Sequence, residues 1–130
     1  MQEPSWLRYD VIIAIHQMQI AEHGGKQGVR DEGLLKSALD RPLNAYHYQE
    51  PKPDLAFLAA SYAYGIARNH PFIDGNKRTA FVALRLFLKI NQLDLKASQQ
   101  DKYTIIMKLA SGRLSESELA DWIEKNQIEG

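Results

Sequence analysis

The feature that most constrains this 130-residue chain is a pair of segments that are apolar on almost every side. The first runs from Asp54 to about Asn69, and the second from about Asn76 to Asn91. Both lengths suit helices, and a helix without a polar face has to be surrounded by other elements. We therefore expect a helical bundle in which these two helices are central and the remaining elements cover them.

Four further helices are predicted from apolar spacing and from start and stop signals. They are Ser5 to His23, Glu32 to Asp40, Ser98 to about Ala110, and a last helix that opens with the capping box of Ser115 and Glu118. The second of these should end at Arg41-Pro42, because the residue before a proline avoids the α region. Residues 43–53 would then form a loop or a short flap hairpin. The predicted fold is all-α: one compact domain of about six helices over residues 1–130.

Composition narrows the possible functions. Lys plus Arg and Asp plus Glu number 16 each, so a broad nucleic-acid surface is not expected and any phosphate recognition should be local. The chain has no cysteine, which excludes a thiol nucleophile and a cysteine zinc site. No apolar stretch is long enough to cross a membrane, and the start Met1-Gln2-Glu3-Pro4 does not resemble a signal peptide. We expect a cytoplasmic protein that contacts no membrane.

The polar stretch between the two apolar helices is the candidate site. Gly75-Asn76 opens the second helix, and a helix start with unpaired backbone N–H groups attracts anions. Lys77 and Arg78 add positive charge where the helix dipole disfavours it, at a cost of about 0.3–1 kcal/mol each. A bound polyphosphate would supply the missing negative charge. The pattern therefore indicates a phosphate site.

Two further side chains give this stretch the means for catalysis. Asp74 can hold Mg²⁺ against the same phosphates, and His70 supplies an imidazole, the side chain most often used as a general base near neutrality. Each feature alone has an ordinary interpretation: a turn with a helix cap, a helix-ending histidine, a solvated pair of cations. Their concentration between two buried helices favours a site. A P-loop does not fit, because no glycine directly precedes Lys77 and no Ser or Thr directly follows it.

At this stretch the chain resembles the Fic/Doc family, whose Fic signature reads His-Pro-Phe-x-Asp/Glu-Gly-Asn-Gly-Arg-x-x-Arg. The matching residues are His70, Pro71, Phe72, Asp74, Gly75, Asn76 and Arg78. Lys77 replaces the second glycine and Phe81 the second arginine. Both departures, together with Arg68, resemble the death-on-curing (Doc) branch. A second stretch, from Gly24 to Pro42, looks like the usual N-terminal segment of that branch, and we interpret it as structural.

The resemblance implies the Fic/Doc fold and an ATP-dependent phosphotransferase that uses Mg²⁺. His70 would be the base and Asp74 the metal ligand. The phosphates would be held by Arg68, Gly75, Asn76, Lys77 and Arg78. Family members of the Doc branch are toxins that phosphorylate elongation factor Tu and halt translation. An extended target segment could pair with the flap around Tyr46-His47-Tyr48.

Two other functions stay open: an AMP transferase of the Fic type, and an inactive binding module that retains the fold. The resemblance also implies control by a separate, Phd-like antitoxin. Self-inhibited Fic proteins carry Ser/Thr-x-x-x-Glu-Gly/Asn, and within these 130 residues the nearest segments have Gly28 before Glu32-Gly33 and Lys125 before Glu129-Gly130. Neither has the required hydroxyl residue.

Overall fold

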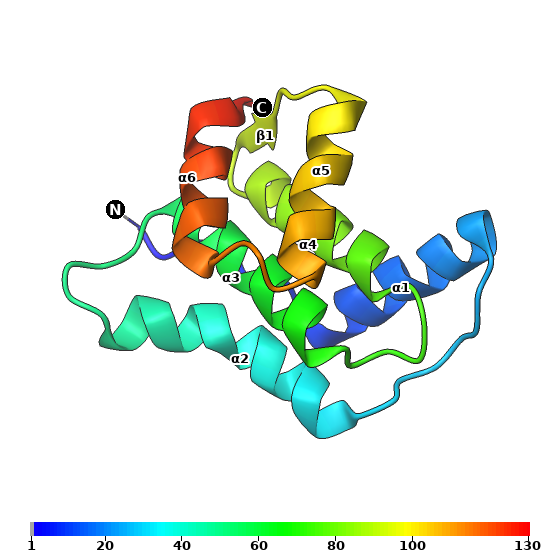
Figure 1. The fold of residues 1–130 in the computed structure, drawn as a ribbon. Coiled ribbons are helices and arrows are strands. Elements are labelled where there is room, and N and C mark those ends of the chain that lie inside the picture. Colours follow the sequence, from blue (N-terminus) through cyan, green and yellow to red (C-terminus); the bar gives the residue numbers. More distant parts are fainter. Residues whose placement is uncertain (1) are drawn as a thin grey trace.

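The computed structural model describes residues 2–130, so Met1 of the predicted domain lies outside the described residues. Six helices and a small two-stranded sheet make up this part of the chain (Figure 1). The helices are α1 Tyr9–His23, α2 Glu32–Tyr48, α3 Leu55–Asn69, α4 Asn76–Ile90, α5 Gln99–Ala110 and α6 Glu116–Asn126. The strands are β1 Leu93–Leu95 and β2 Gln127–Glu129. The all-α prediction of about six helices is confirmed.

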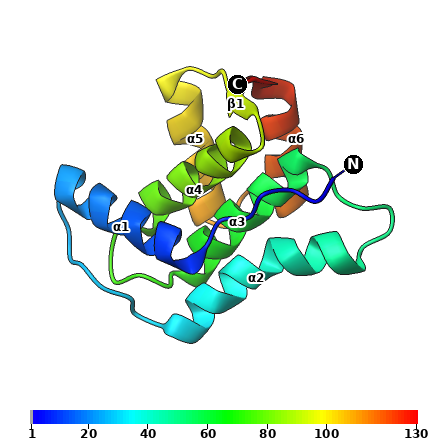
Figure 2. The ribbon, with the colours of Figure 1, turned by 180° about the vertical axis from the view of Figure 1, so that it is seen from behind.

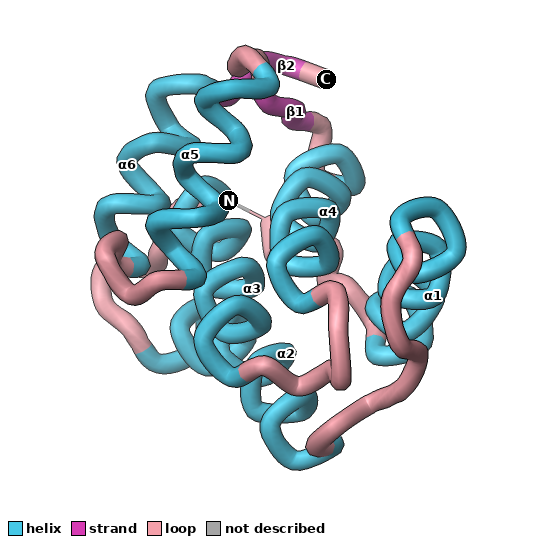
Figure 3. Tube along the Cα trace, turned by 45° about the vertical axis from the view of Figure 1, so that its right-hand side comes forward, coloured by secondary structure: helices cyan, strands magenta, loops and turns pink. Residues whose placement is uncertain are grey.

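The two apolar helices are central, as their composition predicts. α3 makes its most extensive contacts with α4, α2 and α6, and α1 packs on the other side of α4 (Figure 3). Most of α3 is buried, including Leu58, Tyr62 and Ile66. Ala38 of α2 approaches Gly65 so closely that a Cβ at Gly65 would lie 3.0 Å from the Ala38 Cα. None of the helices within residues 2–130 is both long and apolar enough to cross a membrane.

The first helix starts later than predicted. α1 begins at Tyr9, not near Ser5, because the preceding residues bond to other parts of the fold. The Leu7 N–H donates to the Tyr62 hydroxyl (3.0 Å), and Ser5 exchanges two hydrogen bonds with the Asn91 side chain (2.8 and 3.0 Å). Figure 2 shows this segment running across α3. The Ser5 backbone and the Leu7 N–H are thus satisfied by tertiary contacts, and they do not need a helix.

The prediction that the second helix ends at Arg41-Pro42 is wrong, because α2 continues through Pro42 to Tyr48. An internal proline costs a helix about 3 kcal/mol. Burial of Pro42, Ala45 and Tyr46 on one helical face offsets this, since a large buried apolar side chain contributes roughly 1.5–3 kcal/mol. Tyr46-His47-Tyr48 is therefore helical, and neither the predicted loop nor a flap hairpin begins at residue 43.

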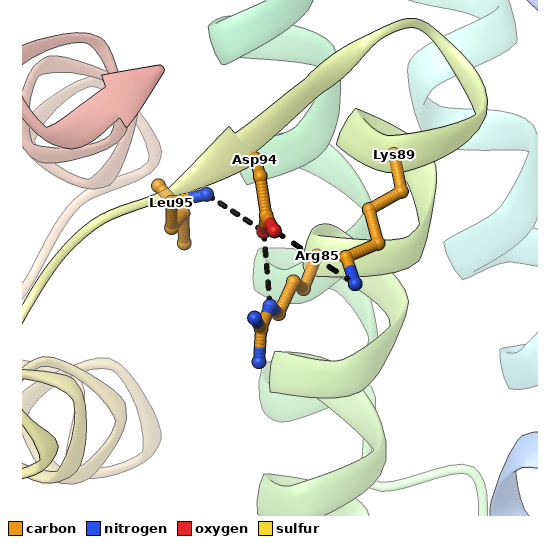
Figure 4. Close-up of polar contacts among 4 residues, drawn as sticks. All are labelled: Arg85, Lys89, Asp94 and Leu95. Atoms are coloured by element: carbon orange, nitrogen blue, oxygen red, sulfur yellow. Dashed lines mark hydrogen bonds and ion pairs between the residues drawn. The ribbon is translucent and has the colours of Figure 1, made fainter. Parts of the chain in front are cut away.

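The described strands follow α4 and α6 in the chain and pair with each other. β1 and β2 are antiparallel, with Asp94 opposite Ile128. Asp94 also ties β1 to α4: its carboxylate accepts from Arg85 Nε (3.0 Å) and the Leu95 N–H (2.8 Å), and lies 3.7 Å from Lys89 Nζ (Figure 4). The sequence predicted only a connector at Leu93 to Ala97. The capping box of Ser115 and Glu118 at α6 is confirmed.

Candidate active site

The loop that joins α3 to α4 is shaped by two left-handed residues. His70 ends α3 with φ 50° and ψ 55°, and Gly75 precedes α4 with φ 74°. A histidine at positive φ is uncommon, and such positions are often found at functional sites. At Gly75 the backbone conformation favours glycine, and a Cβ there would also lie 3.1 Å from Ile20 Cδ1. The loop residues between them are thus held in one tight reversal.

A segment distant in sequence, residues 24–31, holds this loop from outside. Val29 pairs with Phe72 in an isolated antiparallel bridge, and the Ile73 N–H donates to Gly28 O (3.0 Å). The Arg30 guanidinium donates to the carbonyls of His70 (2.8 Å) and Asn69 (2.9 Å). A guanidinium at a helix C-terminus satisfies unpaired carbonyls and favours the helix dipole. The sequence identified this segment as structural but did not show that it supports the loop.

The middle of the loop is fixed by Phe72, which is fully buried. The Asn76 side chain accepts from the Phe72 N–H and donates to its carbonyl, both at 3.0 Å. On the other side the imidazole of His16, from α1, stacks on the Phe72 ring with centroids 3.9 Å apart and an interplanar angle of 6°. Both polar atoms of the Asn76 side chain are therefore used within the loop, and its backbone N–H is the group that remains to bind a ligand.

Asp74 is exposed, and its carboxylate contacts only backbone N–H groups within residues 2–130. Oδ1 accepts from the Gly75 N–H (2.9 Å), and Oδ2 makes a longer contact with the Lys26 N–H (3.3 Å). Gly25 lies directly against this carboxylate, because a Cβ at that position would be 2.7 Å from Oδ2. Gly25, which directly follows the C-cap Gly24 of α1, is thus packed against the candidate metal ligand.

The start of α4 has the properties of an anion site. It has no side-chain cap, and its first intrahelical bond is Thr79 N–H to Gly75 O (3.0 Å). The N–H groups of Asn76, Lys77 and Arg78 consequently find no acceptor in the described part of the chain. The Lys77 and Arg78 side chains are exposed, and no carboxylate among residues 2–130 forms an ion pair with either. Both cations and free N–H groups are available to a phosphate.

These groups share one cleft of about 720 Å³, a size typical of ligand pockets. His70, Asp74, Gly75, Asn76, Lys77 and Arg78 all line it. Sequence reasoning missed the opposite wall, which comes from α5 and is lined by Gln99, Lys102, Tyr103, Ile106 and Met107. Nothing in the α5 pattern distinguished these residues from an ordinary surface, because only the bundle brings α5 to the start of α4.

The structure places Arg68 away from this cleft. It lines a separate cavity of about 470 Å³ between α2 and α3, and no described residue lines both spaces. Its guanidinium lies 5.6 Å from the Tyr64 ring centroid. Gly112, in the turn between α5 and α6, lies beside this guanidinium, because a Cβ there would be 3.4 Å from an Arg68 nitrogen. The structure thus separates Arg68 from the other residues predicted to bind phosphate, and its phosphate-binding role stays a prediction.

Residues 6–88 match the model of the Fic/DOC family, and this span includes the whole loop, all of α3 and most of α4. The chain belongs to the Fic/Doc family. The family resemblance inferred from the loop residues is confirmed. The match ends within α4, so the α5 wall of the cleft lies outside the matched residues.

Two curated relatives carry names of the Doc branch. This Fic/Doc chain is 32% identical to protein kinase doc of Escherichia phage P1 over 114 residues, which is 88% of this chain and 89% of the relative. It is 45% identical to toxin Doc of Mycolicibacterium smegmatis over 74 residues. That second match spans 57% of each chain, little more than half the relative's length.

The donor set of this Fic/Doc site fits Mg²⁺ better than a metal caged by protein. Among residues 2–130, no three imidazole or carboxylate groups lie close enough together to hold a metal ion. Mg²⁺ commonly binds through one or two carboxylates together with substrate phosphates and water. Asp74 accepts one backbone N–H on each oxygen, and a carboxylate has about four lone-pair sites. Asp74 therefore retains lone pairs of the kind that bind a metal ion.

Proposed function

We propose that this protein is a Doc-type toxin that transfers the γ-phosphate of ATP to a Ser or Thr hydroxyl of a translation protein, with elongation factor Tu as the expected target. The observation that supports this most directly is the common cleft of His70, Asp74, Lys77 and Arg78 at the uncapped start of α4. The relatives named toxin Doc and protein kinase doc support the class of activity.

The reaction assigns each residue a step. The His70 imidazole accepts the proton of the target hydroxyl as the hydroxyl oxygen bonds to the γ-phosphorus. The bond between that phosphorus and the β–γ bridging oxygen breaks, and ADP leaves. The His70 side chain makes no hydrogen bond within residues 2–130, so it is free to meet a hydroxyl in the cleft. Phosphoryl transfer depends mainly on positioning and on neutralising charge.

The start of α4 would supply the charge neutralisation. The side chains of Lys77 and Arg78, with the backbone N–H groups of Asn76 and its neighbours, bind the phosphate oxygens. Asp74 would hold Mg²⁺, which neutralises charge that develops on the phosphates. The Gly75 N–H is already donated to Asp74 Oδ1, so Gly75 contributes by orienting that carboxylate and not by direct phosphate contact.

Transfer of phosphate, and not of AMP, is favoured by two residues of the cleft. Lys77 adds bulk and a point charge where Fic proteins have glycine, so the phosphates cannot approach the backbone in the same way. Phe81 replaces the second arginine, which removes a phosphate clamp. Both changes move the triphosphate without touching His70 or Asp74. They are expected to alter which phosphorus faces the hydroxyl.

The test is incubation with a lysate and with ATP labelled at either the α or the γ position, followed by mass spectrometry of the modified protein. We expect label only from the γ position and a mass increase of one phosphate on Ser or Thr. Label from the α position would instead establish an AMP transferase. Nucleotide binding without label on any protein would establish an inactive binding module.

We also propose that activity is restrained by a separate antitoxin chain, since a toxin needs a brake and this sequence has no match to the self-inhibitory motif. The expected partner is a Phd-like segment that folds on the toxin surface. Expression of the active chain alone should arrest growth, while the His70→Ala variant should be tolerated. Harmless high-level expression of an active enzyme would contradict the need for a partner.

A further inference from the structure

His16 is a buried histidine that the proposed reaction does not use. It lies on α1, only 3% exposed, and is the only charged or titratable side chain in the buried polar set of residues 2–130. Its Nε2 is 2.8 Å from the carbonyl oxygen of Asp74. A carbonyl only accepts, so Nε2 must carry a proton and donate it. This hydrogen bond joins His16 to the residue that is expected to bind metal, so His16 does more than fill space in the core.

The bond that His16 makes fixes a peptide plane. The Asp74 carbonyl and the Gly75 N–H belong to the same peptide unit, which is planar and rigid. His16 holds the carbonyl at one edge of this unit, and the N–H at the other edge donates to Asp74 Oδ1 at 2.9 Å. Rotation of the plane would therefore break both bonds together. The position of the carboxylate depends in this way on a donor from α1.

The position of the His16 ring is itself constrained. The ring stacks on Phe72, and Phe72 is held through its backbone by the Asn76 side chain. The nearest His16 atom would be 3.7 Å from a Cβ at Gly75, so the loop is packed closely against the imidazole. The donor cannot shift without disturbing the aromatic stack.

We infer that His16 is a positioning residue, which orients the Asp74–Gly75 peptide and thereby aims the Asp74 carboxylate into the cleft. The orientation itself is independent of the reaction, whereas its consequence for Mg²⁺ rests on the function proposed above. Groups that orient a metal ligand typically change metal affinity or activity by about 10–100-fold when they are removed.

Two substitutions separate the donor from the ring. His16→Phe keeps a flat aromatic ring against Phe72 but has no N–H to donate. His16→Gln loses the ring, but its side-chain amide can place an N–H close to the position of Nε2. If His16 only fills space, His16→Phe should be the milder change. If it positions Asp74, His16→Gln should be the milder one.

The decisive measurement is amide hydrogen exchange of the full chain by NMR, because it needs neither metal nor catalysis. In His16→Phe we expect the Gly75 amide to exchange about tenfold faster, since its acceptor is no longer held in place, while core amides of α3 such as Ala63 keep their protection. In His16→Gln the Gly75 rate should return towards wild type. An unchanged Gly75 rate in His16→Phe, an equal rise at Ala63, or no difference between the two variants would each overturn the inference.

A second measurement connects the inference to the proposed chemistry. Mg²⁺ binding is titrated calorimetrically in the presence of a non-hydrolysable ATP analogue. We expect Kd to rise about 10–100-fold in His16→Phe and much less in His16→Gln. Wild-type affinity in His16→Phe would overturn the link to Asp74. If the wild-type protein binds no metal, the proposed metal role fails, while the exchange result still decides whether His16 orients the loop.

Discussion

Each end of α4 carries two cationic side chains, but the two ends differ in whether a carboxylate of the described residues pairs with them. At its C-terminal end, Arg85 and Lys89 both lie against Asp94, and the helix dipole favours cations there (Figure 4). At its N-terminal end, Lys77 and Arg78 stand where the dipole disfavours them, and no acid in the described part of the chain pairs with them. The comparison teaches that the cations at one end of α4 are neutralised by an acid of the fold, whereas those at the other end suit the anion site proposed above.

The two aspartates at these ends differ in the same way. Asp94 accepts from Arg85 and from the Leu95 N–H, and the Arg85 hydrogen bond is the largest cause that lowers the pKa of Asp94 below its ordinary value of 3.8. Among the described residues, Asp74 accepts from just two backbone N–H groups, and it lines the cleft. One carboxylate is satisfied by its own protein, and the other retains capacity for a ligand.

The largest effect should come from the base. His70→Asn removes the imidazole but tolerates the left-handed backbone, so the loop should keep its shape. We expect the transfer rate to fall by about 10²–10⁴-fold, the usual contribution of a general base, with the melting temperature nearly unchanged. The rate is measured with labelled ATP and the isolated target. If the variant retains the wild-type rate, His70 is not the general base. The functional interpretation of the N-terminal end of α4 would then lose its main support.

Removal of the free carboxylate should have the next largest effect. Asp74→Asn keeps an oxygen that can accept the Gly75 N–H, so the change is mainly the loss of charge. We expect activity to drop by about 100-fold or more, because a metal contributes several kcal/mol of charge stabilisation. Activity is compared with Mg²⁺ and with EDTA. Equal wild-type rates under the two conditions would mean that Asp74 holds no metal.

The glycine pair before the loop offers a matched test of how closely the site is packed. Gly24 and Gly25 both have positive φ, so alanine strains the backbone at either position. A Cβ at Gly25 would lie 2.7 Å from Asp74 Oδ2, whereas no atom of the described residues lies within 4 Å of a Cβ at Gly24. Gly25→Ala should therefore lower activity by about tenfold by displacing the carboxylate.

Gly24→Ala is the control for that experiment, because it adds comparable backbone strain away from Asp74. Activity and thermal unfolding are measured for both variants. If the two lose activity equally, backbone strain and not contact with Asp74 is responsible.

The smallest effect is expected at the paired end of the helix. Asp94→Asn should leave transfer unchanged and lower the free energy of unfolding by about 0.5–1 kcal/mol, since the ion pairs are partly exposed to solvent. The folded-state pKa of Asp94 is depressed, so its contribution is present above pH 4 and is lost as the pH falls through the folded-state value. The free energy of unfolding of the wild type should therefore fall towards that of Asp94→Asn as the pH is lowered, because protonated Asp94 no longer forms the ion pairs. Urea unfolding between pH 7 and pH 3 measures this, and curves that stay parallel would contradict the assignment.

Much of the fold could be predicted because its signals are local. The caps at Asp54, Ser98 and Ser115 each bond to a backbone N–H within the next turn, so the sequence alone indicates where α3, α5 and α6 begin. The apolar composition of α3 and α4 likewise requires burial whatever surrounds them. The loop residues from His70 to Arg78 could be recognised because their chemistry lies in one short stretch.

Only the tertiary structure decided the rest, because the responsible contacts join residues far apart in the chain. Helix α2 continues past Pro42 because Ala45 and Tyr46 find a buried surface, which no local pattern shows. Arg68 is close to His70 in sequence, yet it lines another cavity, together with residues of α2 and Glu116 that only the fold brings to it. The donor to the Asp74 carbonyl comes from His16, at a sequence separation of 58, because α1 packs beside α4. Sequence determines which groups are available to the site, while packing of distant helices determines which of them meet.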